Sequence, residues 1–186
     1  MARTPSTMQA LGTPLPQFEL EDTEGRVFSS SRDLGPIGTL VIFMCNHCPF
    51  VVHLRETLAT FTSEMIGRGL TVVGISSNDV DAYPQDGPEE MKRERKESGY
   101  EFPYLYDESQ EVAKAFGAAC TPDFFLYDHD QKLVYRGQFD ESRPGNNSPV
   151  TGESLRMACE SLMGTGKVSE KVEQRPSVGC NIKWRD

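Results

Sequence analysis

The sequence predicts an α/β protein in which a mixed sheet is covered by helices. Apolar runs at residues 39–44 and 70–75 are uninterrupted, as in parallel strands that are buried on both faces. The segment between them places apolar residues at steps of three and four, which is the period of a helix. Two later runs, at residues 123–127 and 132–139, flank a short polar turn and predict an antiparallel hairpin. Parallel strands at the front and a hairpin at the back together give this fold class.

The first half of the chain adds a hairpin and two helices. Residues 17–20 and 26–28 flank a turn-rich tetrapeptide at 22–25 and predict a short N-terminal hairpin. A helix is expected directly after Pro49. Its predicted buried face consists of Val51, Leu54, Leu58, Phe61 and Met65. Residues 89–98 are so highly charged that they predict a helix on the surface.

The second half alternates short elements with loops. Residues 101–106 predict a weak strand, and the proline within it favours a sheet edge or a strand start. Short helices are expected at 109–116, closed by a glycine, and at 151–164. The chain predicts one domain, residues 1–186, with a loose N-terminal arm at 1–14 and an extended tail at 165–186.

Composition limits the partners and the location of the protein. The net charge of −9 and pI near 4.9 argue against nucleic acid and anionic membranes as partners. No apolar run is long enough to span a bilayer, and the N-terminus lacks the apolar core of a secretion signal. Five cysteines, an odd number with one close pair, indicate a reducing compartment, so we expect a cytoplasmic protein.

The close pair, Cys45 and Cys48, lies where a buried strand ends and a helix begins. A helix N-terminus carries unpaired N–H groups and about half a positive charge, so it favours a thiolate. The thiolate attacks disulfides, and a second cysteine three residues on can release the mixed disulfide. His47, when protonated, would stabilise the Cys45 thiolate further. The pattern predicts a redox dithiol in which Cys45 attacks and Cys48 resolves.

A second motif is Cys120-Thr121-Pro122, placed between a helix and the hairpin. A proline is sterically permitted at the first residue of a strand. Base rates for X–Pro bonds favour an ordinary trans bond here, whereas a cis bond would mark a tight turn.

These motifs resemble the thioredoxin superfamily, and within it the peroxiredoxin-like group related to AhpC/TSA proteins. The resemblance rests on CNHCPF at residues 45–50, on Thr121-Pro122, and on PSVGCNIKW at residues 176–184. It implies a thioredoxin fold with a cis Thr121–Pro122 bond, whose backbone pairs with a bound substrate chain. The chain departs from thioredoxin itself in having Met44 in place of a tryptophan and no buried aspartate in the preceding strand.

The predicted function is thiol–disulfide exchange by Cys45 and Cys48, with His47, Thr121 and Pro122 assisting or binding substrate. The substrate would be a disulfide-containing protein or a small thiol, and an external dithiol would supply electrons. No bound cofactor and no metal are expected. The sequence does not indicate an oligomeric state.

Three alternatives stay open. A peroxidase of the peroxiredoxin type would use Cys48. Peroxiredoxins carry a threonine three residues before the peroxidatic cysteine and an arginine that binds peroxide. In this chain Cys45 stands at the threonine position, and no arginine lies near residues 120–122, where the resemblance would place it. Copper or another metal could bind Cys45, Cys48 and His47, with His53 as a further candidate ligand, although a structural zinc site generally needs a second ligand pair. A redox-inert binding module is the third. Cys180 would join the redox chemistry if the tail folds back, and Cys120 if it approaches the dithiol; otherwise Cys120 is a buried, inert thiol.

Overall fold

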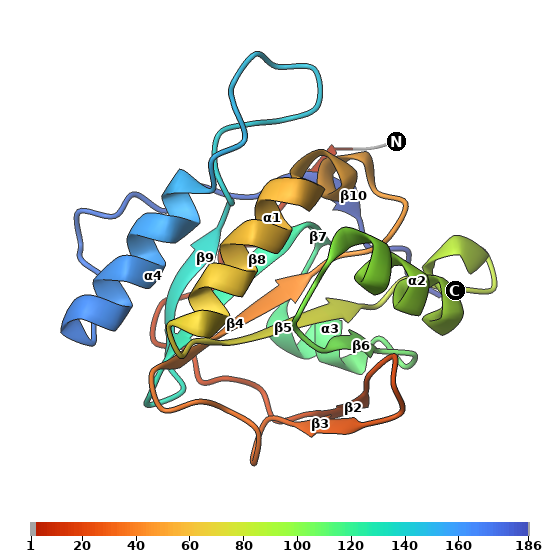
Figure 1. The fold of residues 1–186 in the computed structure, drawn as a ribbon, viewed down its shortest axis with the longest axis horizontal. Coiled ribbons are helices and arrows are strands. Elements are labelled where there is room, and N and C mark those ends of the chain that lie inside the picture. Colours follow the sequence, from red (N-terminus) through yellow and green to blue (C-terminus); the bar gives the residue numbers. More distant parts are fainter. Residues whose placement is uncertain (1–2, 186) are drawn as a thin grey trace.

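The computed structural model describes residues 3–185 and is built around a five-stranded sheet in the order β6–β5–β4–β8–β9 (Figure 1). Its strands are β4 (Gly38–Phe43), β5 (Thr71–Ser76), β6 (Tyr104–Tyr106), β8 (Asp123–Asp128) and β9 (Leu133–Gly137). The pairs β4–β5 and β5–β6 are parallel, and the pairs β4–β8 and β8–β9 are antiparallel. The predicted mixed sheet is thereby confirmed.

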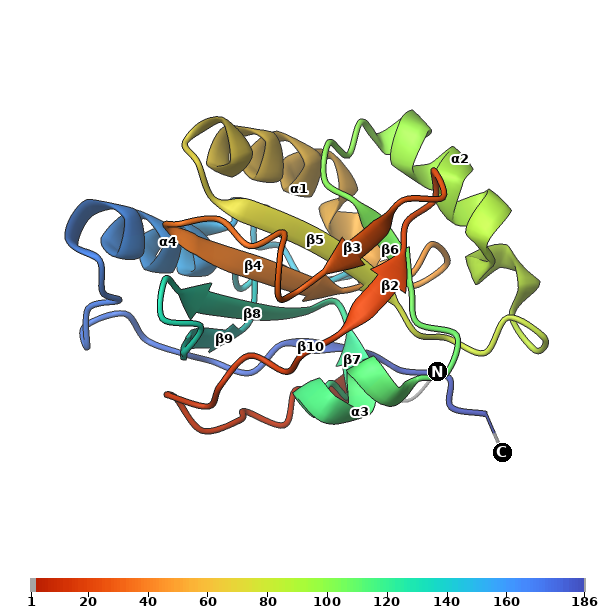
Figure 2. The same cartoon turned by 90° about the horizontal axis from the view of Figure 1, so that it is seen from below.

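Helices cover both faces of this sheet. The helices are α1 (Pro49–Gly67), α2 (Pro88–Ser98), α3 (Glu111–Phe116) and α4 (Glu153–Thr165), and a 3-10 turn, η1, spans Pro84–Asp86. Figure 2 shows α1 and α4 on one face and α3 on the other. None of the helices formed by residues 3–185 is both long and apolar enough to cross a membrane.

The alternation of side chains along β4 explains why the strand is buried throughout. Leu40 and Ile42 pack in the core beneath α1 and α4, whereas Val41 and Phe43 pack in the core beneath α3. The predicted buried face of α1 is also confirmed, since all five of its residues are buried. Because β4 is packed on both faces, the position of its C-terminal end is fixed, and the cysteines follow directly after that end.

The N-terminal hairpin forms as predicted, from β2 (Glu19–Glu21) and β3 (Val27–Ser29). It lies beside β6, where Asp22 bridges to Leu105. β6 is an edge strand of the five-stranded sheet, as its proline indicated.

The expectation of a loose N-terminal arm is wrong for the described residues. Strand β1 (Arg3–Pro5) pairs with β10 (Val178–Asn181), which in turn pairs with β7 (Cys120–Thr121). The predicted tail is extended, but its strand β10 is paired with β1 and β7 in this second sheet. Strands of two to four residues carry too little alternation to be recognised, and their partners lie far apart in the sequence.

The capping residues of two predicted helices shift by one position. Gln110, with φ of 64°, precedes α3 instead of Ser109, and Gly152, with φ of 68°, precedes α4 instead of Thr151. Gly117 closes α3 in the left-handed conformation, as predicted.

Candidate redox site

The two cysteines lie at the junction of β4 and α1, as the sequence predicted. Cys48 is the N-cap of α1 and Pro49 its first residue, a position that suits proline because it needs no N–H partner. Cys45 is 1% exposed and Cys48 0% exposed. A substrate sulfur can therefore reach Cys45 only after neighbouring side chains move.

Thr121 contacts both cysteines and precedes a cis bond to Pro122. The Thr121 hydroxyl lies 3.6 Å from Cys45 Sγ, and Cys48 Sγ lies 3.1 Å from the Thr121 carbonyl oxygen, to which it donates when it is protonated. Strand β7 reaches this position because its backbone pairs with β10, with Cys180 opposite Thr121. The resemblance implied that the backbone at Thr121 and Pro122 pairs with a bound substrate chain. In this structure the Thr121 backbone pairs with β10 of the same protein.

A hydrogen bond between the two thiols separates their acidities. That bond lowers the pKa of Cys48 to about 5, with help from Thr121, Cys180 and the Val51 amide. The same bond, followed by burial and by the Asp86 carboxylate, raises the pKa of Cys45 well above its usual value. In the reduced pair the negative charge therefore lies on Cys48, at the positive end of α1, and Cys45 holds the shared proton. This distribution is the reverse of the expectation that Cys45 ionises first.

Proton transfer between the thiols reconciles this charge distribution with attack by Cys45. The Cys48 thiolate accepts a hydrogen bond from Cys45 and can take its proton as Cys45 attacks. Once protonated, Cys48 has an acceptor ready in the Thr121 carbonyl. Both protonation states of Cys48 thus find partners within the site.

Asp86 is the principal residue of the site that the sequence did not reveal. Its carboxylate is fully buried and accepts hydrogen bonds from the backbone amides of Asn46 and His47, at 2.9 and 3.3 Å. It also pairs with His47 Nδ1 at 2.6 Å and with Asn78 Nδ2 at 2.8 Å. His47 Nδ1 lies 4.0 Å from Cys45 Sγ, so the histidine that was expected to act on Cys45 is shared with a carboxylate. Nothing in the sequence of the polar segment around residue 86 distinguished this aspartate from its neighbours.

Replacing Asp86 by asparagine is expected to destabilise the protein. The amide offers one acceptor oxygen in place of two and no charge, so buried donors lose their partner, at a cost of about 1–3 kcal/mol. Removing the carboxylate should also lower the pKa of Cys45. Thermal unfolding should show a fall of about 2–4 °C per kcal/mol. The matched control is Asp130→Asn, whose side chain is exposed; equal melting temperatures for the two variants would contradict the role of the Asp86 network.

Donor atoms of Cys45, His47 and Asp86 lie within 4.8 Å of one another. Sulfur, nitrogen and oxygen in this arrangement are a donor set that zinc accepts. In this structure the histidine and the carboxylate bond each other directly, so we interpret the group as a hydrogen-bonded network.

A second buried carboxyl group, Asp123, follows Pro122. It is 0% exposed, and its side-chain oxygens lack a well-formed hydrogen bond within residues 3–185. Burial raises its pKa well above the usual value. The carboxyl that β4 lacks is therefore present on the neighbouring strand, on the face of Phe43.

The remaining cysteines are all buried, in different surroundings. Cys180 lies in β10 and its thiol is hydrogen-bonded to that of Cys48. Cys120 donates weakly to the Pro122 carbonyl at 3.8 Å, and burial raises its pKa. Cys159 packs on the apolar face of α4. The tail therefore folds back, and it brings Cys180 to the dithiol.

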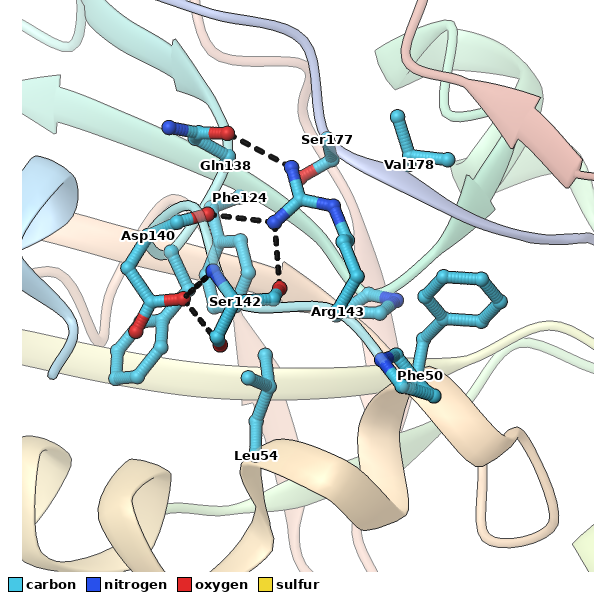
Figure 3. Close-up of a pocket in the computed structure, with 12 residues that line it drawn as sticks. Phe50, Leu54, Phe124, Gln138, Asp140, Ser142, Arg143, Ser177 and Val178 are labelled. Atoms are coloured by element: carbon cyan, nitrogen blue, oxygen red, sulfur yellow. Dashed lines mark hydrogen bonds between the residues drawn. The ribbon is translucent and has the colours of Figure 1, made fainter. Parts of the chain in front are cut away.

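A narrow cavity opens beside Pro122, lined by Phe50, Leu54 and Val178 among others (Figure 3). Its free volume is about 10 Å³, which is roughly that of one water molecule. Arg143 lies at this cavity, but its guanidinium donates to the Asp140 and Ser142 carbonyls at 2.6 and 2.7 Å and to a glutamine at 2.7 Å. Arg143 thus lines the same cavity as Pro122, but its hydrogen bonds are with residues of its own loop.

The pKa of Cys48 provides a direct test of the thiol–thiol hydrogen bond. In Cys45→Ala the donor is gone, so the midpoint for Cys48 ionisation should rise from about 5 toward that of an ordinary thiol, near 8.5. Cys45→Ser keeps a donor and should stay lower. A thiol with a depressed pKa is present as the thiolate at every pH above that pKa. Alkylation of Cys48 by iodoacetamide at pH 6 should therefore be more than about tenfold slower in Cys45→Ala than in the wild type. Coinciding midpoints for the two variants would show that the bond does not set the pKa.

The five-stranded sheet and the helices on its two faces form a thioredoxin fold. The thioredoxin domain of a thiol-disulfide oxidoreductase from Bacteroides vulgatus has the same fold, with a TM-score of 0.61 and 18% identity, over 80% of this chain and 96% of that one.

The chain belongs to the AhpC/TSA family, whose sequence profile matches residues 11–136. An uncharacterized conserved protein from Geobacillus kaustophilus is 48% identical, with a TM-score of 0.95, over 100% of this chain and 97% of that one. A hypothetical protein from Sinorhizobium meliloti 1021 is 49% identical, with a TM-score of 0.94, over 98% of both chains. The comparison with curated proteins gives no match.

Proposed function

We propose that the protein is a thiol–disulfide oxidoreductase whose redox centre is Cys45 and Cys48. The observation that carries the proposal is that Thr121 contacts both cysteines at the N-terminus of α1: its hydroxyl lies 3.6 Å from Cys45 Sγ and its carbonyl oxygen 3.1 Å from Cys48 Sγ. Two thiols held against the same residue can form a disulfide with little movement, and a thiolate with a low pKa is available at neutral pH.

The proposed cycle begins when Cys45 passes its proton to Cys48 and attacks one sulfur of a substrate disulfide. The substrate S–S bond breaks, one substrate thiolate leaves, and a mixed disulfide forms at Cys45. Cys48 then attacks Cys45 Sγ, releases the second substrate thiol and closes the Cys45–Cys48 disulfide. An external dithiol reduces this disulfide and restores the pair. His47 and the Thr121 hydroxyl lie beside Cys45 and assist its ionisation, and Pro122 shapes the opposite side of the site. No bound cofactor is needed, and we place the protein in a reducing compartment, the cytoplasm.

An equilibrium redox titration, with alkylation and peptide mass mapping at each potential, tests this proposal. A reversible two-electron Cys45–Cys48 couple, together with reduction of an external disulfide such as oxidised glutathione, is the expected result. The midpoint potential of this couple would show whether the protein acts as a reductant or as an oxidant. A protein that forms no Cys45–Cys48 disulfide and reduces no external disulfide would overturn the proposal.

Peroxide reduction at Cys48 is the second candidate. The pKa of about 5 favours it, because a thiolate is the form that peroxide oxidises to a sulfenic acid. The threonine that peroxiredoxins place three residues earlier is replaced by Cys45, and Arg143 is bonded to its own loop. Rapid peroxide-dependent formation of a Cys48 sulfenic acid would favour this candidate.

A further inference from the structure

Cys48 neighbours two other thiols. It is hydrogen-bonded to Cys45 and to Cys180 of β10. Cys180 is 2% exposed and belongs to the same core cluster as the dithiol. Thr121 is a neighbour of all three residues, since it contacts both cysteines of the pair and lies opposite Cys180 in the β7–β10 ladder.

The chain around Cys180 is shaped for this approach. The preceding residue is Gly179, and a Cβ atom there would lie 1.9 Å from the Thr121 carbonyl oxygen. Only a glycine lets β10 run this close to β7. On its outer side β10 is held by β1, with Arg3 opposite Cys180. The position of Cys180 is thus fixed by strands on both sides.

From this arrangement we propose that Cys180 is a third redox cysteine. It attacks Cys48 in the oxidised pair and converts the Cys45–Cys48 disulfide into a Cys48–Cys180 disulfide. This inference rests on the proposed function and adds a step within the same site. The Cys180–Cys48 bond forms as the Cys45–Cys48 bond breaks, and the electron pair leaves on Cys45. The proton of Cys180 ends on Cys45, so the step needs no oxidant or reductant from outside. It returns Cys45 to the thiol form while the protein stays oxidised.

The chemistry of Cys180 differs between the two redox states of the pair. In the reduced protein, burial and the hydrogen bond with Cys48 raise the pKa of Cys180 to about 12, so it remains a thiol. Once Cys48 is joined to Cys45 it carries no charge, and its contribution to raising that pKa disappears. Burial remains, so we expect an exchange in which proton transfer to the departing Cys45 accompanies the attack.

Cys120 provides the matched control. It is as deeply buried as Cys180 and lies in β7, the strand beside it, with Asn181 as its ladder partner. Its thiol bonds the Pro122 carbonyl and forms no hydrogen bond with Cys48 that the structure records within residues 3–185. Cys120→Ser should therefore leave the Cys48–Cys180 exchange in place.

The experiment is mild oxidation of the full-length protein followed by peptide mapping without reduction. Tryptic cleavage places Cys45 and Cys48 together in residues 33–55 and Cys180 in residues 172–183. In Cys45→Ser, diamide should join these two peptides through Cys48 and Cys180. The link should persist in Cys45→Ser/Cys120→Ser and be lost completely in Cys45→Ser/Cys180→Ser. In the oxidised wild type, a maleimide should label Cys45 within the linked species, and Cys180→Ser should abolish that label.

The inference is overturned if the two peptides never join in Cys45→Ser while the wild type forms its Cys45–Cys48 disulfide and reduces oxidised glutathione. It is also overturned if the Cys45→Ser link forms but oxidised wild type contains the Cys45–Cys48 disulfide alone. A wild type that neither forms Cys45–Cys48 nor reduces glutathione would instead overturn the proposed function. The two failures are therefore distinguishable.

Discussion

Replacing Cys48 by serine is expected to stop the catalytic cycle after its first step, with substrate held in a mixed disulfide at Cys45. The serine removes the sulfur that resolves this intermediate but preserves a hydroxyl of similar size at the N-cap of α1. It also removes the thiolate that Cys45 hydrogen-bonds, which is the largest cause of the raised pKa of Cys45. Cys45 should then ionise more readily and capture a disulfide faster than it can be released.

The measurement is turnover of an external disulfide, with mass spectrometry of the intact protein. Cys48→Ser should lose turnover by about 10³-fold or more and gain the mass of the substrate thiol. Cys45→Ser should lose turnover equally without accumulating an adduct. Because the resting charge lies on Cys48, the comparison is also a test of roles: accumulation of adduct in Cys45→Ser alone would make Cys48 the attacking residue and Cys45 the resolving one.

The parts of the site that could be predicted from the sequence are those encoded locally. The run at 39–44, the cysteines and the apolar residues of α1 follow one another along the chain, so strand, dithiol and helix are recognised together. Thr121 and Pro122 precede an apolar hairpin strand, and the resemblance then places them beside the dithiol. Burial of the sheet on both faces followed from the same runs.

The parts that could not be predicted depend on contacts between distant segments. Asp86 is one acidic residue in a polar loop, and only the fold brings it under the backbone of Asn46 and His47. Arg3–Pro5 and Val178–Asn181 are short and show no hydrophobic alternation, yet their pairing determines where Cys180 lies. The acidity of the pair was also misjudged, because helix position favours a thiolate on either cysteine and the hydrogen bond between them decides which one holds it.

Replacing Gly179 by alanine is expected to have a large effect on stability for a change of one methyl group. The added Cβ would lie 1.9 Å from the Thr121 carbonyl oxygen and 2.6 Å from its carbon, both of them backbone atoms. Backbone held by pairing on one side and by a buried site on the other cannot yield as a flexible side chain would. Either β10 separates from β7 or Thr121 shifts toward the cysteines, and overpacking of this kind costs about 1–3 kcal/mol or more.

Thermal unfolding tests this expectation against a matched substitution. Gly67→Ala adds the same methyl group at the end of α1, where no atom other than those of the adjoining helix backbone and chain neighbours lies within 4 Å, and should be neutral or stabilising by up to about 1 kcal/mol. Gly179→Ala should lower the melting temperature by about 2–4 °C for each kcal/mol lost. Because separation of β10 from β7 also moves Cys180, the same variant should reduce the yield of the Cys48–Cys180 link in the Cys45→Ser background. A Gly179→Ala protein that melts with the wild type and keeps that link would show that the close approach of β10 to Thr121 is not needed for either property.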